Sequence, residues 1–137
     1  MNKFGHPKLR ILDPKSDPRP WGEEILLTDT TKYMGKLLMY DAGKQGGLQY
    51  HNEKDETFHL VQGTGFMDYD RGDGTLNSLR MGQGDTIHIP TRAIHRFRAI
   101  TDCVGYEFST YHVDDRVRVE DQYPNDPYQD KSGLKTT

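Results

Sequence analysis

Residues that bind metal ions recur at short intervals in the middle of this chain. His51 and Glu56 are separated by four residues, and His95 follows a turn that contains a proline. Gln49 lies two positions before His51, so both side chains point to the same face if this run is a strand. Imidazole and carboxylate groups are usual ligands of divalent metals, and an amide oxygen can complete the set. The pattern predicts a metal site of three or four ligands: Gln49, His51, Glu56 and His95.

Glycine and proline stand at fixed distances from these ligands. The two stretches read Gly43-x5-Gln49-x-His51-x4-Glu56-x6-Gly63 and Gly84-x5-Pro90-x-Arg92-x2-His95-x3-Ala99. They resemble the two motifs of the cupin superfamily, in which Arg92 replaces a glycine and Ala99 replaces an asparagine. The resemblance implies an all-β cupin double-stranded β-helix, a jelly-roll barrel that holds a divalent metal ion (zinc, manganese, iron or nickel).

A narrower resemblance extends over most of the chain. It adds Arg19-Pro20-Trp21-Gly22 near the start and the run from Asp114 to Asp121 near the end. These segments look like those of small cupins of the mannose-6-phosphate isomerase type, in which a Gln-x-His pair is a familiar ligand arrangement. Glu53 departs from that group, which commonly has a histidine there. The resemblance implies a sugar or sugar phosphate substrate and aldose–ketose isomerisation or epimerisation.

Polar side chains on the neighbouring predicted strands are candidates for proton transfer and substrate binding. An isomerase needs a base that removes a proton next to a carbonyl group while a metal polarises that carbonyl. The candidates for the base are Lys36, His88 and Glu107. The candidates for substrate binding are Tyr40, which shares a strand face with Lys36, and the arginines Arg92 and Arg98, which could meet a phosphate.

Two other functions fit the same ligands. His51, Glu56 and His95 alone form a set of two histidines and one carboxylate, which on iron(II) leaves positions open for oxygen and substrate. This set would suit a cupin dioxygenase. The glutamine in a ligand position and the arginine in a glycine position also suit a non-catalytic, sugar-binding cupin.

Short β-rich runs between turn residues must position these side chains. Several runs alternate apolar and polar residues, which is typical of strands with one face on a core. Arg71-Gly72-Asp73-Gly74 predicts a hairpin turn. The expected strands are Glu24–Thr28, Gly35–Tyr40, Leu48–His51, Thr57–Gln62, Gly65–Asp70, Leu76–Arg80, Thr86–Ile89, His95–Ile100 and Gly105–Tyr111. Nine short strands favour a sandwich or small barrel.

A length of 137 residues predicts a single domain. We expect a barrel core over residues 21–112, with extended arms at 1–20 and 113–137. The alternation of charge with Val117 and Val119 in the second arm favours an edge strand and a homodimer. Cys103 lies in an apolar run, which predicts a buried thiol.

The charge balance excludes some partners. The net charge is −3, so no broad basic surface for nucleic acid or for an anionic membrane is expected. No apolar run is long enough to span a bilayer, and the first ten residues lack the apolar stretch of a signal peptide. We therefore expect a cytoplasmic protein that acts on a small molecule.

Overall fold

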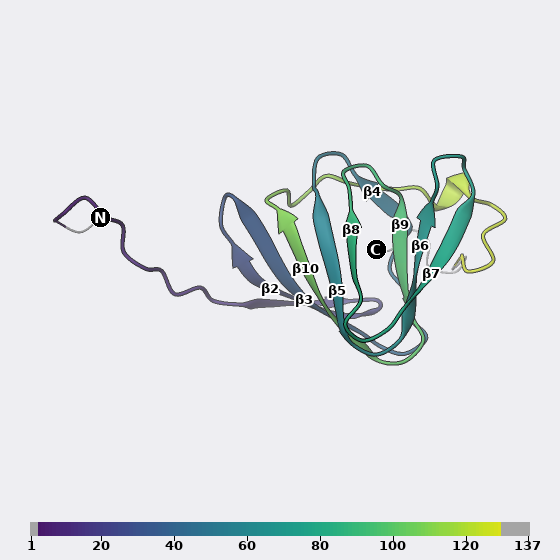
Figure 1. The fold of residues 1–137 in the computed structure, drawn as a ribbon, viewed down its shortest axis with the longest axis horizontal. Coiled ribbons are helices and arrows are strands. Elements are labelled where there is room, and N and C mark those ends of the chain that lie inside the picture. Colours follow the sequence, from purple (N-terminus) through teal and green to yellow (C-terminus); the bar gives the residue numbers. More distant parts are fainter. Residues whose placement is uncertain (1–2, 130–137) are drawn as a thin grey trace.

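Two antiparallel sheets face each other in the computed structural model, which describes residues 3–129 (Figure 1). The first sheet has the strand order β1 (Lys15–Arg19), β2 (Gly22–Asp29), β3 (Tyr33–Tyr40), β10 (Cys103–Thr110), β5 (Glu56–Gln62) and β8 (Thr86–Ile89). The second has the order β11 (Arg116–Arg118), β4 (Gln49–His51), β9 (His95–Ala99), β6 (Gly65–Asp70) and β7 (Leu76–Met81). This arrangement confirms the predicted all-β jelly-roll barrel.

Strand alternation builds the core between the sheets. On β5, Phe58 and Leu60 are buried, while His59 between them is partly exposed. On β10, Cys103 and Gly105 are buried on the same inward face, which confirms the buried thiol. Gly105 lies so close to Phe58 that an added Cβ would stand 2.6 Å from the ring. The barrel is therefore narrow, and only alternate residues need to be apolar.

All nine predicted runs contain a strand, and the predicted turn joins β6 to β7 as an antiparallel hairpin. Two further strands, β1 and β11, form in the segments that the sequence predicted as arms. β1 pairs with β2 at one edge of its sheet, where Pro18 is tolerated because an edge strand needs fewer backbone donors. β11 pairs with β4 at the edge of the other sheet, as the valine alternation predicted.

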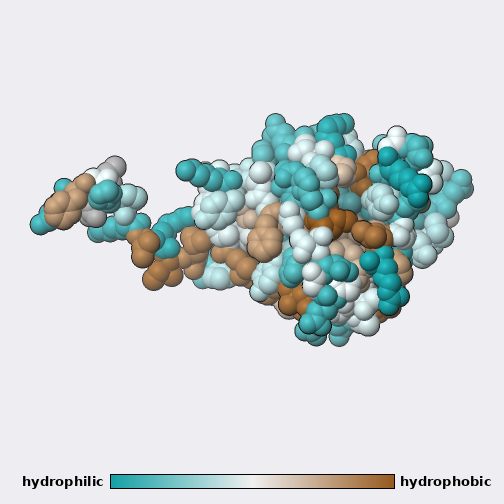
Figure 2. Space-filling model, in the orientation of Figure 1, coloured by the Kyte–Doolittle hydropathy of each residue, from teal (hydrophilic) through white to brown (hydrophobic). Residues whose placement is uncertain are grey.

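The N-terminal and C-terminal segments differ in their contacts with the barrel. Residues 3–14 extend away from the barrel, and Figure 2 shows hydrophobic surface along this arm. After β11, the chain passes through a short 3₁₀ helix, η1 (Glu120–Gln122), and its last described residues contact the outer side of β9. Residues 1–2 and 130–137 of the predicted arms lie outside the described residues. No helix in the described part of the chain is long and apolar enough to cross a membrane.

Candidate metal centre

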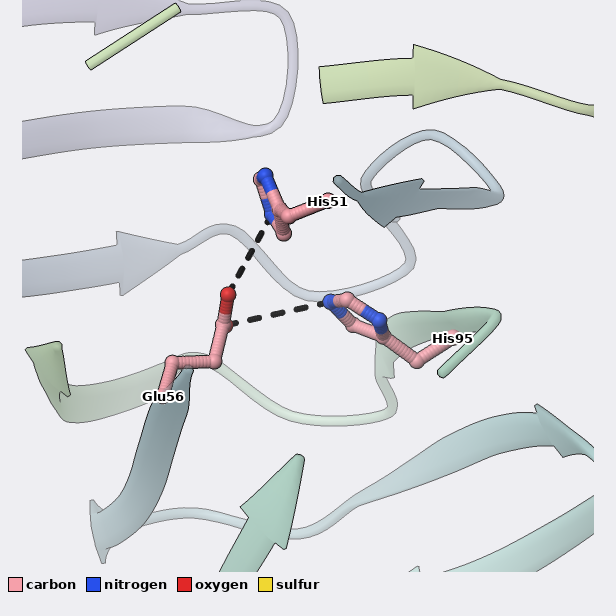
Figure 3. Close-up of side chains that lie close together, drawn as sticks. All are labelled: His51, Glu56 and His95. Atoms are coloured by element: carbon pink, nitrogen blue, oxygen red, sulfur yellow. Dashed lines mark ion pairs between the residues drawn. The ribbon is translucent and has the colours of Figure 1, made fainter. Parts of the chain in front are cut away.

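Three strand ends meet at one end of the barrel and bring the predicted ligands together. His51 is the last residue of β4, Glu56 the first of β5 and His95 the first of β9. All three side chains are buried, and Figure 3 shows them pointing toward one another. One potential ligand atom of each lies within 4.8 Å of those of the other two. The three residues therefore form a compact cluster with the shape of a metal site.

Within this cluster the carboxylate of Glu56 lies between the two imidazoles. Its Oε2 is 3.2 Å from Nε2 of His51, and its Oε1 is 3.8 Å from Nε2 of His95. The two imidazole rings are 5.9 Å apart between centroids. The distances leave the three groups close enough to share one ion.

Hydrogen bonds behind the imidazoles fix which ring nitrogens face the centre. Nδ1 of His51 is 3.1 Å from the carboxylate of Asp115, and Nδ1 of His95 is 2.9 Å from the backbone oxygen of Ala93. Each Nδ1 therefore donates its proton outward, and each Nε2 turns a lone pair toward Glu56. Metal-binding histidines usually have this arrangement, since the outer acceptor orients the ring and raises its basicity.

The charge states also suit a metal. Burial, together with the positive charge of Lys54, lowers the pKa of His51 to about 4. The hydrogen bond with Asp115 acts in the opposite direction but has a smaller effect. Burial lowers the pKa of His95 as well. Burial, together with the negative charge of Glu107, raises the pKa of Glu56. Both imidazoles are neutral at neutral pH and can donate lone pairs, while the charge of Lys54, 3.6 Å from Glu56, does not offset the effects of burial and of Glu107 on that carboxyl group.

An unpartnered atom supports the same conclusion. Oε2 of Glu56 is buried and accepts no hydrogen bond from the residues that the structure describes, although Nε2 of His51 lies 3.2 Å and Nζ of Lys54 3.6 Å away. Two lone pairs facing each other inside a protein repel unless a proton or a metal ion lies between them, and the raised pKa of Glu56 reflects this need. Two neutral nitrogens and one carboxylate are a donor set for zinc, manganese, iron or nickel, so these residues fit the predicted ion.

Gln49 lies next to this cluster. It stands directly opposite His95 in the pairing of β4 with β9, so the two side chains project from the same face. It lines the same inner cavity as Glu56 and His95. Gln49 is therefore placed where its amide oxygen can join the three ligands.

A buried ion pair lies beside the ligands. Nζ of Lys54 is 2.9 Å from the carboxylate of Glu107 and 3.6 Å from that of Glu56. Burial alone would raise the pKa of Glu107, but the charges of Lys54 and Lys36 hold it below its usual value. Ser109 donates a further hydrogen bond to Glu107 at 3.2 Å. Glu107 is thus a carboxylate at neutral pH. Lys54 links it to Glu56 of the ligand cluster.

Two connected cavities give access to the centre. The inner one, of about 90 Å³, is lined by Glu56, His95 and Tyr40, whose ring stacks on Trp21 at 4.0 Å. The outer one, of about 260 Å³, is lined by His51 and Lys36. The side chains that line both cavities are Arg19, Glu24, Gln49, Glu107 and Arg116.

Three of the predicted site residues lie elsewhere. His88 stands opposite Thr57 on the outer face of the sheet, is 59% exposed and pairs with Asp55, so it cannot act as the base in the barrel. Arg98 projects from the face of β9 opposite to His95 and pairs with Asp68. Lys36, Tyr40 and Glu107, in contrast, line the cavities.

Arg92 is the third of these residues. It is exposed, donates a hydrogen bond to Asn52 at 2.9 Å and lies over the ring of Tyr50. Its φ of 72° shows why a glycine is typical at this position of the motif, because this left-handed region is unfavourable for other residues. Arg92 is thus placed outside both cavities.

Two residues of the site were not predicted. Lys54 lies between two predicted ligands in the sequence, but a lysine in a polar turn is ordinarily solvated, and here it is only 5% exposed. Asp115 lies in the predicted C-terminal arm. The pairing of β11 with β4 carries it to His51, and the expected edge strand was the only signal of that pairing.

Comparison with known proteins agrees with the fold and with the ligand cluster. The family model described as "Cupin domain" matches residues 36–105, just over half of the chain and the region that holds all four predicted ligands. The chain therefore belongs to the cupin family, and its His-Glu-His cluster is of the metal-binding type. No curated protein matches the sequence.

Solved structures with the same fold differ widely in sequence. The capsular polysaccharide assembling protein CapF from Staphylococcus aureus superimposes with a TM-score of 0.70 at 18% identity, over 79% of this chain and 34% of CapF. KdgF from Halomonas sp. gives 0.62 at 20% identity, over 75% of this chain and 89% of KdgF. Bacillus subtilis oxalate decarboxylase superimposes with a TM-score of 0.67 at 16% identity, over 80% of this chain and 31% of the decarboxylase. The chain thus spans about a third of the length of CapF, and these similarities show the fold alone.

Proposed function

We propose that this cupin binds a divalent metal ion through His51, Glu56 and His95, with Gln49 as a fourth ligand, and acts on a sugar or sugar phosphate. The observation that carries the proposal is the buried carboxylate of Glu56, whose Oε2 lies 3.2 Å from the Nε2 of His51 and has no hydrogen-bond partner among residues 3–129. The resemblance to small cupins of the mannose-6-phosphate isomerase type and the fold shared with a polysaccharide-assembling protein support a sugar substrate. Mn(II) centres in oxalate decarboxylase support manganese among the candidate metals.

The reaction we propose is an aldose–ketose isomerisation or an epimerisation. A bound divalent ion would polarise the carbonyl group of the sugar. Glu107 is the best placed base, because it is ionised, buried and 2.9 Å from Lys54, which in turn reaches Glu56. In an isomerisation its carboxylate takes the proton from the carbon next to the carbonyl and returns it to the former carbonyl carbon, while the hydroxyl proton moves to the former carbonyl oxygen. In an epimerisation Glu107 takes the same proton, and a water molecule returns a proton to the opposite face of the same carbon. Lys54 orients Glu107 through their hydrogen bond.

Proton exchange tests this assignment directly. The metal-loaded protein is incubated in deuterated water with mannose 6-phosphate, fructose 6-phosphate and unphosphorylated ketoses, and deuterium incorporation is followed by NMR. We expect incorporation into one of them, its loss in Glu107→Gln, and its retention in Glu53→Gln, whose side chain is 71% exposed. Absence of exchange with every substrate would argue against the isomerase and the epimerase.

A dioxygenase is the second candidate, since the three strongest ligands are two histidines and one carboxylate. Iron-dependent oxygen consumption with a small-molecule substrate would favour it. Turnover that persists without oxygen would exclude it. Binding of a sugar without turnover in either assay would favour the non-catalytic alternative.

We also propose a homodimer in which the N-terminal arm of one copy packs on the other. Leu9 and Ile11 are 102% and 99% exposed, and their spacing puts both on one side of an extended chain. The outer face of the first sheet holds an apolar groove of about 640 Å³ with the exposed rings of Tyr33 and Phe108. The arm points away from its own barrel (Figure 1), so within residues 3–129 it does not cover this groove, and a second chain would cover both surfaces.

The oligomeric state decides this part of the proposal. Light scattering after size-exclusion chromatography should give twice the mass of one chain. Replacing both Leu9 and Ile11 by serine should shift the protein toward the monomer, whereas Leu79→Ser, an exposed leucine on β7, should not. A monomeric wild-type protein at micromolar concentration would contradict the proposal.

A further inference from the structure

Arginines gather at the mouth of the metal centre. In the pairing of β11 with β4, Arg116 stands opposite His51 and Arg118 opposite Gln49. Directly opposed residues of an antiparallel pair project from the same face. Both guanidinium groups therefore lie on the side of the sheet that carries the metal ligands.

The two arginines differ in their partners. Arg118 is neutralised by Glu120, with its Nε 3.1 Å from both carboxylate oxygens, and it packs against Gly47. Arg116 has no ion pair within residues 3–129, although it lies near Glu24 and Glu120. Arg116 is thus a solvent-exposed cation at the edge of the two cavities.

Arg19 approaches the same place from β1. Its Nη2 contacts Glu24 at 3.2 Å and Asp17 at 3.4 Å, but its Nε is buried and has no hydrogen-bond partner in the described part of the chain. Arg19 and Arg116 both line the inner and the outer cavity. Both arginines therefore lie beside the space between the ligand cluster and solvent.

The proximity of these cations is unfavourable without an anion. Burial lowers the pKa of Arg116, and the positive charges of Arg19 and Arg118 lower it further. Of the carboxylates that act on Arg116, Glu24 is already shared by Arg19 and Lys36, and Glu120 is paired with Arg118. An anion that accepts hydrogen bonds from Arg116 and from the free Nε of Arg19 would relieve this repulsion, and a bound divalent ion would add to the attraction.

We propose that Arg116 and Arg19 form a binding site for an anionic group of the substrate, a phosphate or a carboxylate, at the mouth of the metal centre. This inference rests on the proposed function and narrows its substrate class to anionic sugars. The sequence candidates for this role, Arg92 and Arg98, are held by other partners. A substrate bound at both places has its anionic end at the arginines and its carbonyl end at the ligand cluster, beside Glu107.

Calorimetric titration of the full chain, loaded with metal, tests the site. The probes are fructose 6-phosphate for a phosphate, gluconate for a carboxylate and fructose as the neutral control. We expect one anionic sugar to bind more tightly than fructose, and Arg116→Gln to weaken that binding roughly tenfold or more, as for one lost charge-assisted contact. Arg116→Lys should restore part of the affinity, because it keeps the charge but not the paired donors. Arg80→Gln, an exposed arginine on β7, should change nothing.

Metal content measured on every variant separates the two proposals. If the wild type retains no metal, the proposed function fails, and the same titration on the metal-free chain still decides the arginine site. Unchanged affinity of Arg116→Gln for the anionic sugar overturns the inference. Equal binding of anionic and neutral sugars by the wild type overturns it as well.

Discussion

Two buried clusters of charged residues share strand β9, and they are built in opposite ways. Arg96 projects outward and donates hydrogen bonds to Asp68 at 2.7 Å and to Asp126 at 2.6 Å, with 1% of its side chain exposed. His95, one position earlier, projects inward to Glu56. On the outer side every carboxylate has an arginine, whereas on the inner side a carboxylate oxygen has no hydrogen-bond partner.

The difference in hydrogen bonding indicates a structural role for the outer cluster and a ligand-binding role for the inner one. Buried ion pairs with complete hydrogen bonding hold segments together, and the outer cluster ties the C-terminal segment to the barrel through Asp126. An incomplete buried cluster is tolerated where a ligand completes it. The same strand thus carries a structural ion-pair network on one face and a candidate metal centre on the other.

Breaking the outer cluster should have the largest effect on stability. Arg96→Met leaves Asp68 and Asp126 buried with fewer partners, so we expect a loss of about 3–5 kcal/mol in the free energy of unfolding. Urea denaturation measures it, and Arg80→Met on the surface should cost less than about 0.5 kcal/mol. A loss below about 1 kcal/mol for Arg96→Met would show that the network is not structural. If that variant does not fold, Asp126→Asn provides a milder test.

Neutralising the inner carboxylate should affect metal binding but not the metal-free fold. At a metal concentration of 100 times Kd, the wild-type protein should gain about 2.7 kcal/mol of stability. Glu56→Gln should gain none. Without metal it should be about as stable as the wild type, since the pKa of Glu56 is raised by burial and Lys54 keeps its shorter ion pair with Glu107. Denaturation with and without metal measures both values. A large loss of metal-free stability would instead place Glu56 in a structural role like that of Asp68.

The residue behind His51 should have an intermediate effect. Asp115→Asn removes the carboxylate that orients the imidazole, and we expect metal affinity to fall about 10- to 100-fold. Competition with a chelator measures the affinity. Asp114→Asn, which also lines the outer cavity, is the neighbouring control. Equal effects of the two variants would show that Asp115 acts only through its charge.

The smallest effect is expected outside both clusters. Arg92→Gly relieves a left-handed backbone but loses the contacts with Asn52 and Tyr50. We expect a change of about 1 kcal/mol or less in the free energy of unfolding, and no change in metal content. Weaker binding of the sugar to this variant, with metal content unchanged, would show that Arg92 contributes to substrate binding.

Strand alternation predicted much of the fold, and its limits are visible on single residues. Gln49 and His51 were correctly expected on one face because they are two positions apart. By the same rule, Arg98 is three positions after His95 and faces away, a signal that the sequence already contained. For His88 the register of β8 against β5 was needed, since a shift of one residue would turn it inward.

The sequence by itself determined the all-β class, the ligand types and their spacing, because strand periodicity and motif distances are local properties. The tertiary structure alone decided that Asp115 orients His51 from 64 positions away and that Lys54 is buried against Glu107, 53 positions away. It also decided that Arg116 lies at the mouth of the site without an ion pair to any residue from 3 to 129. These contacts depend on how distant strands pair and on which carboxylate reaches which cation, and no local pattern records that outcome.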